Sequence, residues 1–528
     1  MANEQHVRRD WRPKESPLSA TLQVLGFAAL LAVGVGLYVR HAHQRKDLFE
    51  RVEEARLAAR EDNPRSLRAA LEVLDRALEV DDGDAEALSL AASLHAELWL
   101  THHEAQSEAK ARELIARAVA VDAQTAERFA TEGLLALASG EGSRARKELA
   151  ALLERGATSP LLFYAAAQAY QDGAELSAAN EHFRRAMEVG RSQPRFSLAY
   201  ADYAVGDGRL GPAAEVLEQS LTTHEGHLRS LLLAGLVGAY RGQVGDEARA
   251  LVKELLEKRE PELSKALAAD AHALAAHAAL ARGDLPGALK EAAAGLSADP
   301  RNVHAAAARA HTLTLQGSPE ADAAWLEAAA LRPSATFFYL QGSEALLRAG
   351  RTGGARALLD AWEKVFAPVR IPGEDGQPIP ALDREDRFWI ARARLAEATD
   401  QQEQALAHYQ RAVAAKGLQQ ADALLGLGRL QLAREDWDGA HQTLAQVAPE
   451  DGTGLLPDAY RAMGEIHFHR GDYTRGAAHF GYALGRLKEQ GAPIAQREAL
   501  RAEVGQRLQK LRQPQLSRAW LEESKQLL

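Results

Sequence analysis

Three histidines near the middle of the chain are the side chains whose spacing first suggests ligand binding. His277 and His311 lie 34 residues apart, with His304 between them. If they face one another, their imidazoles could grip an acidic or aromatic ligand group, or share one metal ion. The alternative is that they are exposed residues of alanine-rich helices. A titration without Zn²⁺ uptake would exclude the metal.

Other residue types that commonly do chemistry are missing or badly spaced. His102 and His103 are adjacent and would point about 100° apart on a helix, and His467 and His469 are two residues apart. The chain has no cysteine, which excludes disulfides, thiolate nucleophiles and cysteine-bound zinc. No P-loop, serine-hydrolase or zinc-protease motif occurs. We therefore predict a non-enzymatic protein with no catalytic residues, metal site, cofactor or small-molecule substrate.

The charge balance argues against nucleic acid as a partner. The 528 residues include 63 Lys and Arg against 73 Asp and Glu, a formal net charge of −10, and the pI is about 6.0. The two signs are interspersed and no basic stripe stands out. We expect no nucleic-acid binding.

The element that must position any binding side chain is a helical hairpin repeated about a dozen times. Its clearest copy, residues 458–484, has inner faces that carry Tyr460, Met463, Gly464 and His467 before a Gly-Asp-Tyr turn, and Gly476, Phe480 and Ala483 after it. Gly464 should let the two helices approach closely, Phe480 should fill the gap between them, and Ala483 should leave room for the next hairpin. One hairpin cannot bury its apolar face alone, so the hairpins must stack.

The interval between copies supports this repeat. The position equivalent to Ala483 recurs at intervals of 33 to 36 residues over most of the chain, with longer intervals of 41, 40 and 50. It is held by Ala77, Ala118, Leu152, Ala186, Ser220, Leu255, Gly295, Ala328, Trp362, Ala412, Val447 and Ala483. Alanine also fills eleven of the twelve earlier small positions of the same helices, although only about one residue in five is alanine.

This pattern resembles the tetratricopeptide repeat. Two copies end with the proline common in that family, Pro300 and Pro333, whereas Asp82, Ala123 and Glu225 stand there in other copies. The resemblance covers roughly residues 60–490. It implies an all-α solenoid of about 12 helix-turn-helix repeats whose concave groove binds proteins or peptides.

In that architecture, one face of the first helix of each hairpin lines the groove. The predicted partner-binding residues are Tyr164, Gln168, Gln171, Arg195, Asp202, Tyr240, His277, His304, His311, Glu344, Arg387, Arg394, Arg429, Arg461 and Glu465. The Lys and Asn pairing with which family members hold acidic C-terminal peptides is absent. Four arginines of this set could still receive carboxylates, because a guanidinium group forms a fork that matches them; they are Arg387, Arg394, Arg429 and Arg461.

An apolar segment precedes the repeats. Residues 18–39 contain no charged residue, and at about 1.5 Å per residue they reach about 33 Å, enough to cross a hydrocarbon core of about 30 Å. The predicted membrane-spanning residues include Leu18, Leu22, Leu25, Phe27, Leu30, Leu31, Val35, Leu37 and Tyr38. A cleaved signal peptide and a buried soluble helix are the alternatives. We favour an uncleaved anchor, because the run is long, has no small-residue cleavage site after it and has basic residues at both ends.

Basic residues on the two sides of this segment are nearly balanced, so the positive-inside rule gives little direction. The short preceding tail favours a single-pass protein with its N-terminus inside. If the host is bacterial, the repeats would then lie on the periplasmic side of the inner (cytoplasmic) membrane.

The repeats are interrupted once, by a segment rich in proline and glycine. Residues 367–382 read APVRIPGEDGQPIPAL, which neither a helix nor a central strand can accommodate. We predict a linker here; an extended segment that contacts a partner is the alternative. The predicted domains are a tail (1–17), a transmembrane helix (18–39), a juxtamembrane helix (40–61), an N-terminal array (62–366), the linker (367–384), a C-terminal array (385–490) and capping helices (491–528).

Together these features predict a membrane-anchored scaffold or adaptor that binds protein or peptide partners in cell-envelope assembly, secretion or motility. The alternative is an anchored regulator facing the cytoplasm, similar to the repeat protein that recruits a protease to control lipopolysaccharide synthesis. That family ends in a four-cysteine metal module, which this chain lacks. An enzyme resembling repeat-containing glycosyltransferases would need an α/β catalytic domain, and no segment of the sequence has such a pattern.

Overall fold

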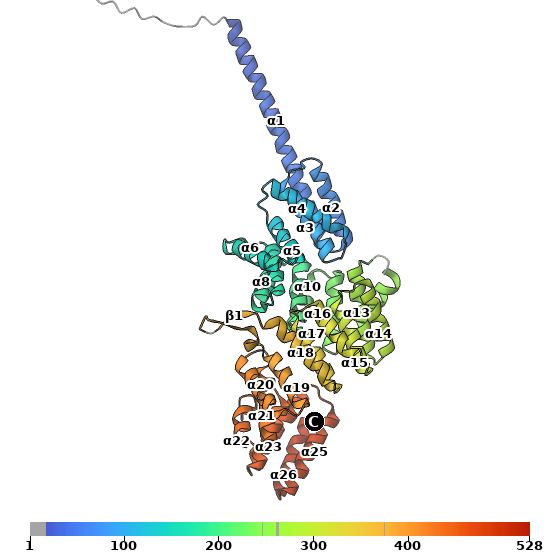
Figure 1. Cartoon of the computed structure of the whole chain (residues 1–528), viewed down its shortest axis with the longest axis vertical. Helices are drawn as coiled ribbons and strands as arrows, with labels where there is room; N and C mark the ends of the chain where they lie inside the picture. Colours follow the sequence, from blue (N-terminus) through green and yellow to red (C-terminus); the bar gives the residue numbers. More distant parts are fainter. Residues whose placement is uncertain (1–16, 245, 260–262, 374) are drawn as a thin grey trace, which may run out of the picture. The chain divides into compact units, whose positions relative to one another are not determined.

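The computed structural model describes residues 17–244, 246–259, 263–373 and 375–528. They belong to two compact units, Met1–Leu135 and Ala136–Leu528. Both units consist almost wholly of α-helices, and the only strands among the described residues are β1 and β2 of the second unit (Figure 1).

The first unit begins with one long helix, α1 (Pro17–Ala58), drawn in blue in Figure 1. It is the one helix among the described residues that is long and apolar enough to cross a membrane, a test of length and composition that a signal sequence also passes. Its predicted membrane-facing side chains are exposed; they are Leu22, Leu25, Phe27, Leu30, Leu31, Val35, Leu37 and Tyr38. The side chain of Leu18 and the tail of residues 1–16 lie outside the described part.

The helices after α1 are the 3₁₀ helix η1 (Ala59–Glu61), α2 (Pro64–Leu78), α3 (Ala85–Leu100), α4 (Gln106–Ala120) and α5 (Ala126–Ala138), whose last residues belong to the second unit. Of these, η1, α2 and α3 pack against the C-terminal end of α1. Leu48, Val52 and Ala55 of α1 are buried in one cluster with residues of α2 and α3. The start of α2 is fixed by Asn63, whose side chain accepts a hydrogen bond from the Ser66 N–H in a capping box.

The second unit continues the hairpins with helices of 8 to 17 residues. The helices before the strands are α6 (Gly142–Glu154), α7 (Pro160–Asp172), α8 (Leu176–Val189), α9 (Pro194–Gly206), α10 (Leu210–Thr223), α11 (Leu228–Tyr240), α12 (Asp246–Glu254), the π-helix η2 (Leu255–Arg259), α13 (Lys265–Ala281), α14 (Leu285–Ala298), α15 (Val303–Leu315), α16 (Ala321–Leu331), α17 (Thr336–Arg348) and α18 (Thr352–Phe366). After the strands come η4 (Ala381–Arg384), α19 (Asp386–Ala398), α20 (Gln402–Ala415), α21 (Gln420–Ala433), α22 (Trp437–Leu444), α23 (Pro457–His469), α24 (Tyr473–Glu489), α25 (Ile494–Lys510), α26 (Pro514–Glu523) and η5 (Ser524–Leu527).

The predicted repeat is confirmed by these bounds. All twelve positions equivalent to Ala483 fall on an even-numbered helix or within three residues of its end. Neighbouring helices of the second unit pack against each other in sequence, from α7 with α8 to α25 with α26. The chain is therefore an all-α, tetratricopeptide-like helical repeat protein.

Within a hairpin, the turn uses a residue with left-handed backbone. Gly471 has φ of 77°, and the following N–H of Asp472 donates to the carbonyl of His467 at 2.9 Å. Gly350 repeats the arrangement at 72°. Glycine adopts this conformation without steric penalty, which is why it marks many of the turns.

Close approach of the paired helices also follows the prediction. A Cβ atom on Gly464 would lie 2.7 Å from the ring of Phe480, so only glycine allows this packing. Phe480 is 2% exposed and Ala483 is fully buried. The roles predicted for Gly464 and Phe480 are confirmed, whereas the room that Ala483 should leave for the next hairpin stays a prediction.

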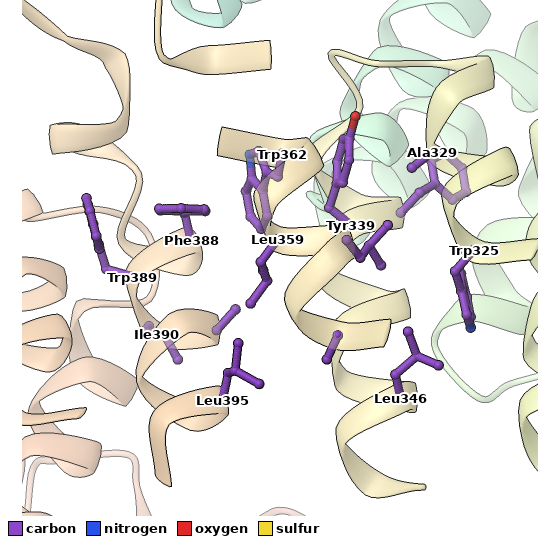
Figure 2. Packing of buried hydrophobic residues seen from close by; sticks show 14 of the residues in the cluster. Trp325, Ala329, Tyr339, Leu346, Leu359, Trp362, Phe388, Trp389, Ile390 and Leu395 are labelled. Carbon is purple, nitrogen blue, oxygen red and sulfur yellow. The ribbon is translucent and has the colours of Figure 1, made fainter. Parts of the chain in front are cut away.

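An aromatic layer holds the core together where the repeat interval is longest. Trp362 is fully buried and lies between Tyr339 and Phe388 in Figure 2. Its ring centroid is 5.8 Å from that of Tyr339, in a stacked contact, and 5.4 Å from that of Phe388, edge to face. These contacts join α17 and α18 to α19 across the segment predicted as a linker.

That segment is an ordered hairpin. β1 (Arg370–Pro372) pairs antiparallel with β2 (Pro378–Pro380) in the register Arg370↔Pro380, Ile371↔Ile379 and Pro372↔Pro378, and Figure 1 shows it projecting from the neighbouring helices. Val369 and Leu382 at its base are buried in the cluster that runs from α15 to α21. The core is thus continuous past the hairpin, and a division into two arrays at 367–384 stays a prediction.

Candidate partner-binding site

The predicted binding residues gather in two places of the second unit, and the first is where α9 meets the start of α17. The guanidinium of Arg332 donates to both carboxylate oxygens of Asp202, at 2.8 and 2.9 Å, across 130 residues of sequence. Beside this pair, a Cβ atom on Gly206 would lie 3.3 Å from that of Ala335. The row of first helices therefore turns back on itself here.

A buried ion-pair network extends this contact to α19. Arg387 is 6% exposed, and it donates to Glu385 at 2.6 and 2.9 Å and to the carboxylate of Asp207 at 2.9 Å. Its third guanidinium nitrogen donates to the backbone carbonyl of Asp207. Although burial opposes it, the two carboxylates raise the pKa of Arg387 above its usual value. We call the span from α9 to α19 the closed turn; Arg387 serves to hold it and has no nitrogen left for a partner.

Three predicted binding residues fill the inside of the closed turn. The Tyr240 hydroxyl lies 2.8 Å from Nδ1 of His304, and the Tyr240 ring contacts those of His277 and Phe337 at centroid distances of 4.8 and 4.9 Å. Burial lowers the pKa of His277 to about 4 and that of His304 to about 3. Both imidazoles are therefore neutral near pH 7, and this part of the inner face is occupied by the chain's own groups.

Asp270 of α13 is a further titratable group of this span. It accepts a hydrogen bond from Asn302 at 2.6 Å. Burial raises the pKa of Asp270 to about 6, although the hydrogen bond from Asn302 opposes the shift. A carboxyl group thus changes its charge close to neutral pH.

The three histidines that suggested a ligand site do not share one set of neighbours. His277 and His304 both contact Tyr240, whereas His311 lies beside Trp325, with 6.3 Å between ring centroids. Across the described residues, no group of three or more His, Asp or Glu side chains could hold a metal ion.

The second place lies between α21 and α23. Arg429, Arg461 and Glu465 line one cavity of about 410 Å³, together with Leu432 and Asp458. Arg461 is 3.7 Å from Asp458, and Glu465 accepts a hydrogen bond from Arg507 of α25. Arg429 is exposed and has no ion-pair partner among the described residues. Of the four arginines expected to receive carboxylates, it is the one without an ion pair in this part of the chain.

The remaining predicted residues are distributed along α7, α9, α17 and α19. The guanidinium of Arg394 donates to Glu344 at 2.5 Å, so these two neutralise each other. The Tyr164 ring packs edge-on against Phe196, and the guanidinium of Arg195 covers that same ring at 4.5 Å. Gln168 and Gln171 are half-buried on α7.

Sequence reasoning missed the partners that close the turn. Arg332, Asp207 and Glu385 sit in loops or at helix ends, and their contacts span up to 180 residues. No local pattern marks such pairs. Asn302 could have been identified from the sequence, because it stands at the N-cap position of α15. Its side chain accepts a hydrogen bond from the Ala305 N–H there.

Comparisons with known proteins add little about function. No protein-family profile matches this chain, and no curated protein does. Among solved structures, it is similar to a chain of the APC/C hetero-tetramer Cut9-Hcn1, with 13% identity, 83% of this chain and 93% of that chain covered, and a TM-score of 0.36. It is also similar to the human IFIT1 dimer with PPP-AAAA, with 15% identity, 76% and 94% covered, and a TM-score of 0.42. At these values neither structure carries an argument about binding.

Proposed function

We propose that this chain is a membrane-anchored, non-enzymatic scaffold that binds an acidic segment of a partner protein between α21 and α23. Stacked helical hairpins present a long inner surface. The closed turn fills part of that surface with the chain's own side chains, so the open part lies further along, at the cavity beside Arg429.

The charge of this cavity supports the proposal. Counting Arg507, which pairs with Glu465, three arginines face two carboxylates, Asp458 and Glu465. The excess positive charge belongs to Arg429, whose guanidinium has no carboxylate partner among the described residues. A charged hydrogen bond to a partner's carboxylate would contribute about 1.5–3 kcal/mol.

The test is charge reversal at Arg429. The full chain would be purified from detergent-solubilised membranes and its co-purifying proteins quantified by mass spectrometry. We expect Arg429→Glu, alone or with Arg394→Glu, to lower recovery of a specific partner at least tenfold. The control is Arg356→Glu, an exposed arginine of α18 outside the cavity. Equal recovery with all variants would refute the site.

We further propose that α1 is an uncleaved membrane anchor in a bacterial inner membrane, with the repeats in the periplasm serving envelope assembly, secretion or motility. Its exposed apolar half and its continuity with the packed residues Leu48 and Val52 support an anchor. Mass spectrometry of the mature N-terminus tests cleavage. A C-terminal reporter active only in the cytoplasm tests orientation, and activity would favour the cytoplasm-facing regulator instead.

A further inference from the structure

A second cavity, larger than the one beside Arg429, lies along α24, the second helix of the last hairpin. Its volume is about 620 Å³, within the range of ligand-binding pockets. α24 contributes residues from Thr474 to Glu489, and α26 and η5 form the facing wall with Leu516, Trp520 and Leu527. Because a helix rises 1.5 Å per residue, this slot is about 22 Å long.

The floor of the slot is a row of small residues that the packing of this chain does not require. Ala478, Gly481 and Gly485 follow one another at spacings of three and four residues. A Cβ atom on Gly485 would meet no atom within 4 Å, and one on Gly481 would meet only Trp520, at 3.8 Å. This differs from Gly464, where a Cβ atom would lie 2.7 Å from Phe480.

Trp520 and Arg486 of the slot already have hydrogen-bond partners within the chain, whereas Glu523 on its rim has no ion-pair partner in the part of the chain that the structure describes. Trp520 donates its indole N–H to the carbonyl of Arg501 at 2.9 Å. Arg486 donates to Glu489 at 2.5 Å and to the carbonyl of Gly452 at 2.6 Å. Glu523 is exposed and has no ion-pair partner among the described residues. The slot thus combines apolar side chains, among them Leu516, Trp520 and Leu527, with polar ones, and it carries an unpaired negative charge at its edge.

We propose that this slot binds an amphipathic helix of a partner protein, with small or aliphatic residues along its buried stripe and a lysine or arginine opposite Glu523. Small residues at three- and four-residue spacing allow a second helix to approach closely. A helix also satisfies its own backbone, which matters because the slot walls offer no row of free N–H and C=O groups, as an extended peptide would need. The proposal is independent of the cavity beside Arg429.

The experiment uses the full chain in phosphatidylcholine nanodiscs and fluorescein-labelled 16-residue peptides, with empty nanodiscs as the blank. One peptide has a Leu/Ala stripe flanked by lysines, a second has glutamates in place of the lysines, and a third has a central proline. We expect the lysine peptide to bind, measured by fluorescence anisotropy, and the other two to bind at least tenfold more weakly.

Two matched pairs of variants locate the binding. Gly485→Leu fills the slot and should weaken the lysine peptide at least tenfold, whereas Gly353→Leu, also with open space around its Cβ, should not. Glu523→Lys should weaken binding of the lysine peptide about fivefold, and Glu522→Lys, outside the slot, should not.

Unchanged binding of the lysine peptide to Gly485→Leu, or equal binding of the proline peptide to the wild type, would overturn the proposal. So would a wild-type dimer that Gly485→Leu converts to a monomer in mass photometry, since a second copy would then occupy the slot. Arg429→Glu should leave peptide binding unchanged.

Discussion

At the scale of single residues, protonation of Asp270 makes the free energy of unfolding depend on pH. Its pKa is raised by burial to about 6, compared with about 3.9 for an aspartate in an unfolded chain. Between these values the folded chain binds more protons than the unfolded chain. Stability therefore falls as the pH rises from about 4 to about 6, and it stays lower above that.

We predict that Asp270→Asn stabilises the protein above pH 6, by about 2 kcal/mol, and has no effect below pH 4. The amide oxygen can still accept from Asn302 and carries no charge to desolvate. Chemical denaturation midpoints at pH 4, 5, 6 and 8 would measure the difference between variant and wild type. Asp383→Asn, at an exposed carboxyl group, is the control. A difference that does not change with pH would contradict the assignment.

His277 and His304 act in the opposite direction. Burial lowers their pKa values, so the stability that depends on their neutral form is present above about pH 6.5 and is lost as the pH falls toward 4. For this reason the comparison of Asp270→Asn with wild type is informative, whereas the pH profile of the wild type alone is not.

At the scale of the helical hairpin, two glycines on paired helices should respond oppositely to the same substitution. Gly464→Ala places a Cβ atom 2.7 Å from Phe480, and such overpacking typically costs about 1–3 kcal/mol. Gly485→Ala meets open space and should gain about 0.5–1 kcal/mol from helix propensity. We expect the thermal midpoint to fall for the first and rise for the second. An unchanged or higher midpoint for Gly464→Ala would show that Gly464 is not in tight contact, and a lower midpoint for Gly485→Ala would show that the space around Gly485 is not open.

The hairpins could be predicted from the sequence because their determinants are local. The Gly464, Phe480 and Ala483 pattern recurs within about 34 residues, and a short turn fixes the pairing of its two helices. The hairpin of β1 and β2 was harder, because its prolines argue against regular structure. Its ladder is only three residue pairs long, below the length that a sequence pattern can signal.

At the scale of the second unit, the closed turn can be tested with a pair of introduced cysteines. The chain has no cysteine of its own, so no native thiol would compete with this pair. A Cβ atom on Gly206 would lie 3.3 Å from that of Ala335, close to the distance in disulfides. We expect Gly206→Cys with Ala335→Cys to form an intramolecular disulfide in mild oxidant, seen by mass spectrometry after non-reducing digestion.

The control for this experiment is Gly211→Cys with Ala335→Cys. A Cβ atom on Gly211 meets no neighbour within 4 Å, so these two thiols should stay reduced. If the first pair also stays reduced while both thiols react with a small alkylating reagent, α9 and α17 are apart in solution.

The candidate site could be predicted from the sequence only in part, because some of its contacts join residues far apart in the chain. Arg429, Arg461 and Glu465, which were expected on one face of the first helices, line one cavity, and their role in partner binding stays a prediction. The sequence pattern could not reveal that Asp202 and Arg387 are held by Arg332 and Asp207, because contacts over 130 to 180 residues depend on the accumulated curvature of several hairpins. A small change in each crossing angle decides whether such residues meet.

The strand register described above determines how a partner can use the projecting hairpin. The backbone nitrogens at positions 370, 372, 378 and 380 point away from the ladder, because the bonded positions alternate with them: Gly373 donates to Gln377 and Ala381 donates to Val369. Three of these four outward positions are proline, which has no N–H to offer. Neither edge of the hairpin therefore offers a row of N–H groups to an added strand, which disfavours edge-to-edge aggregation. A partner that binds this hairpin would have to recognise its side chains.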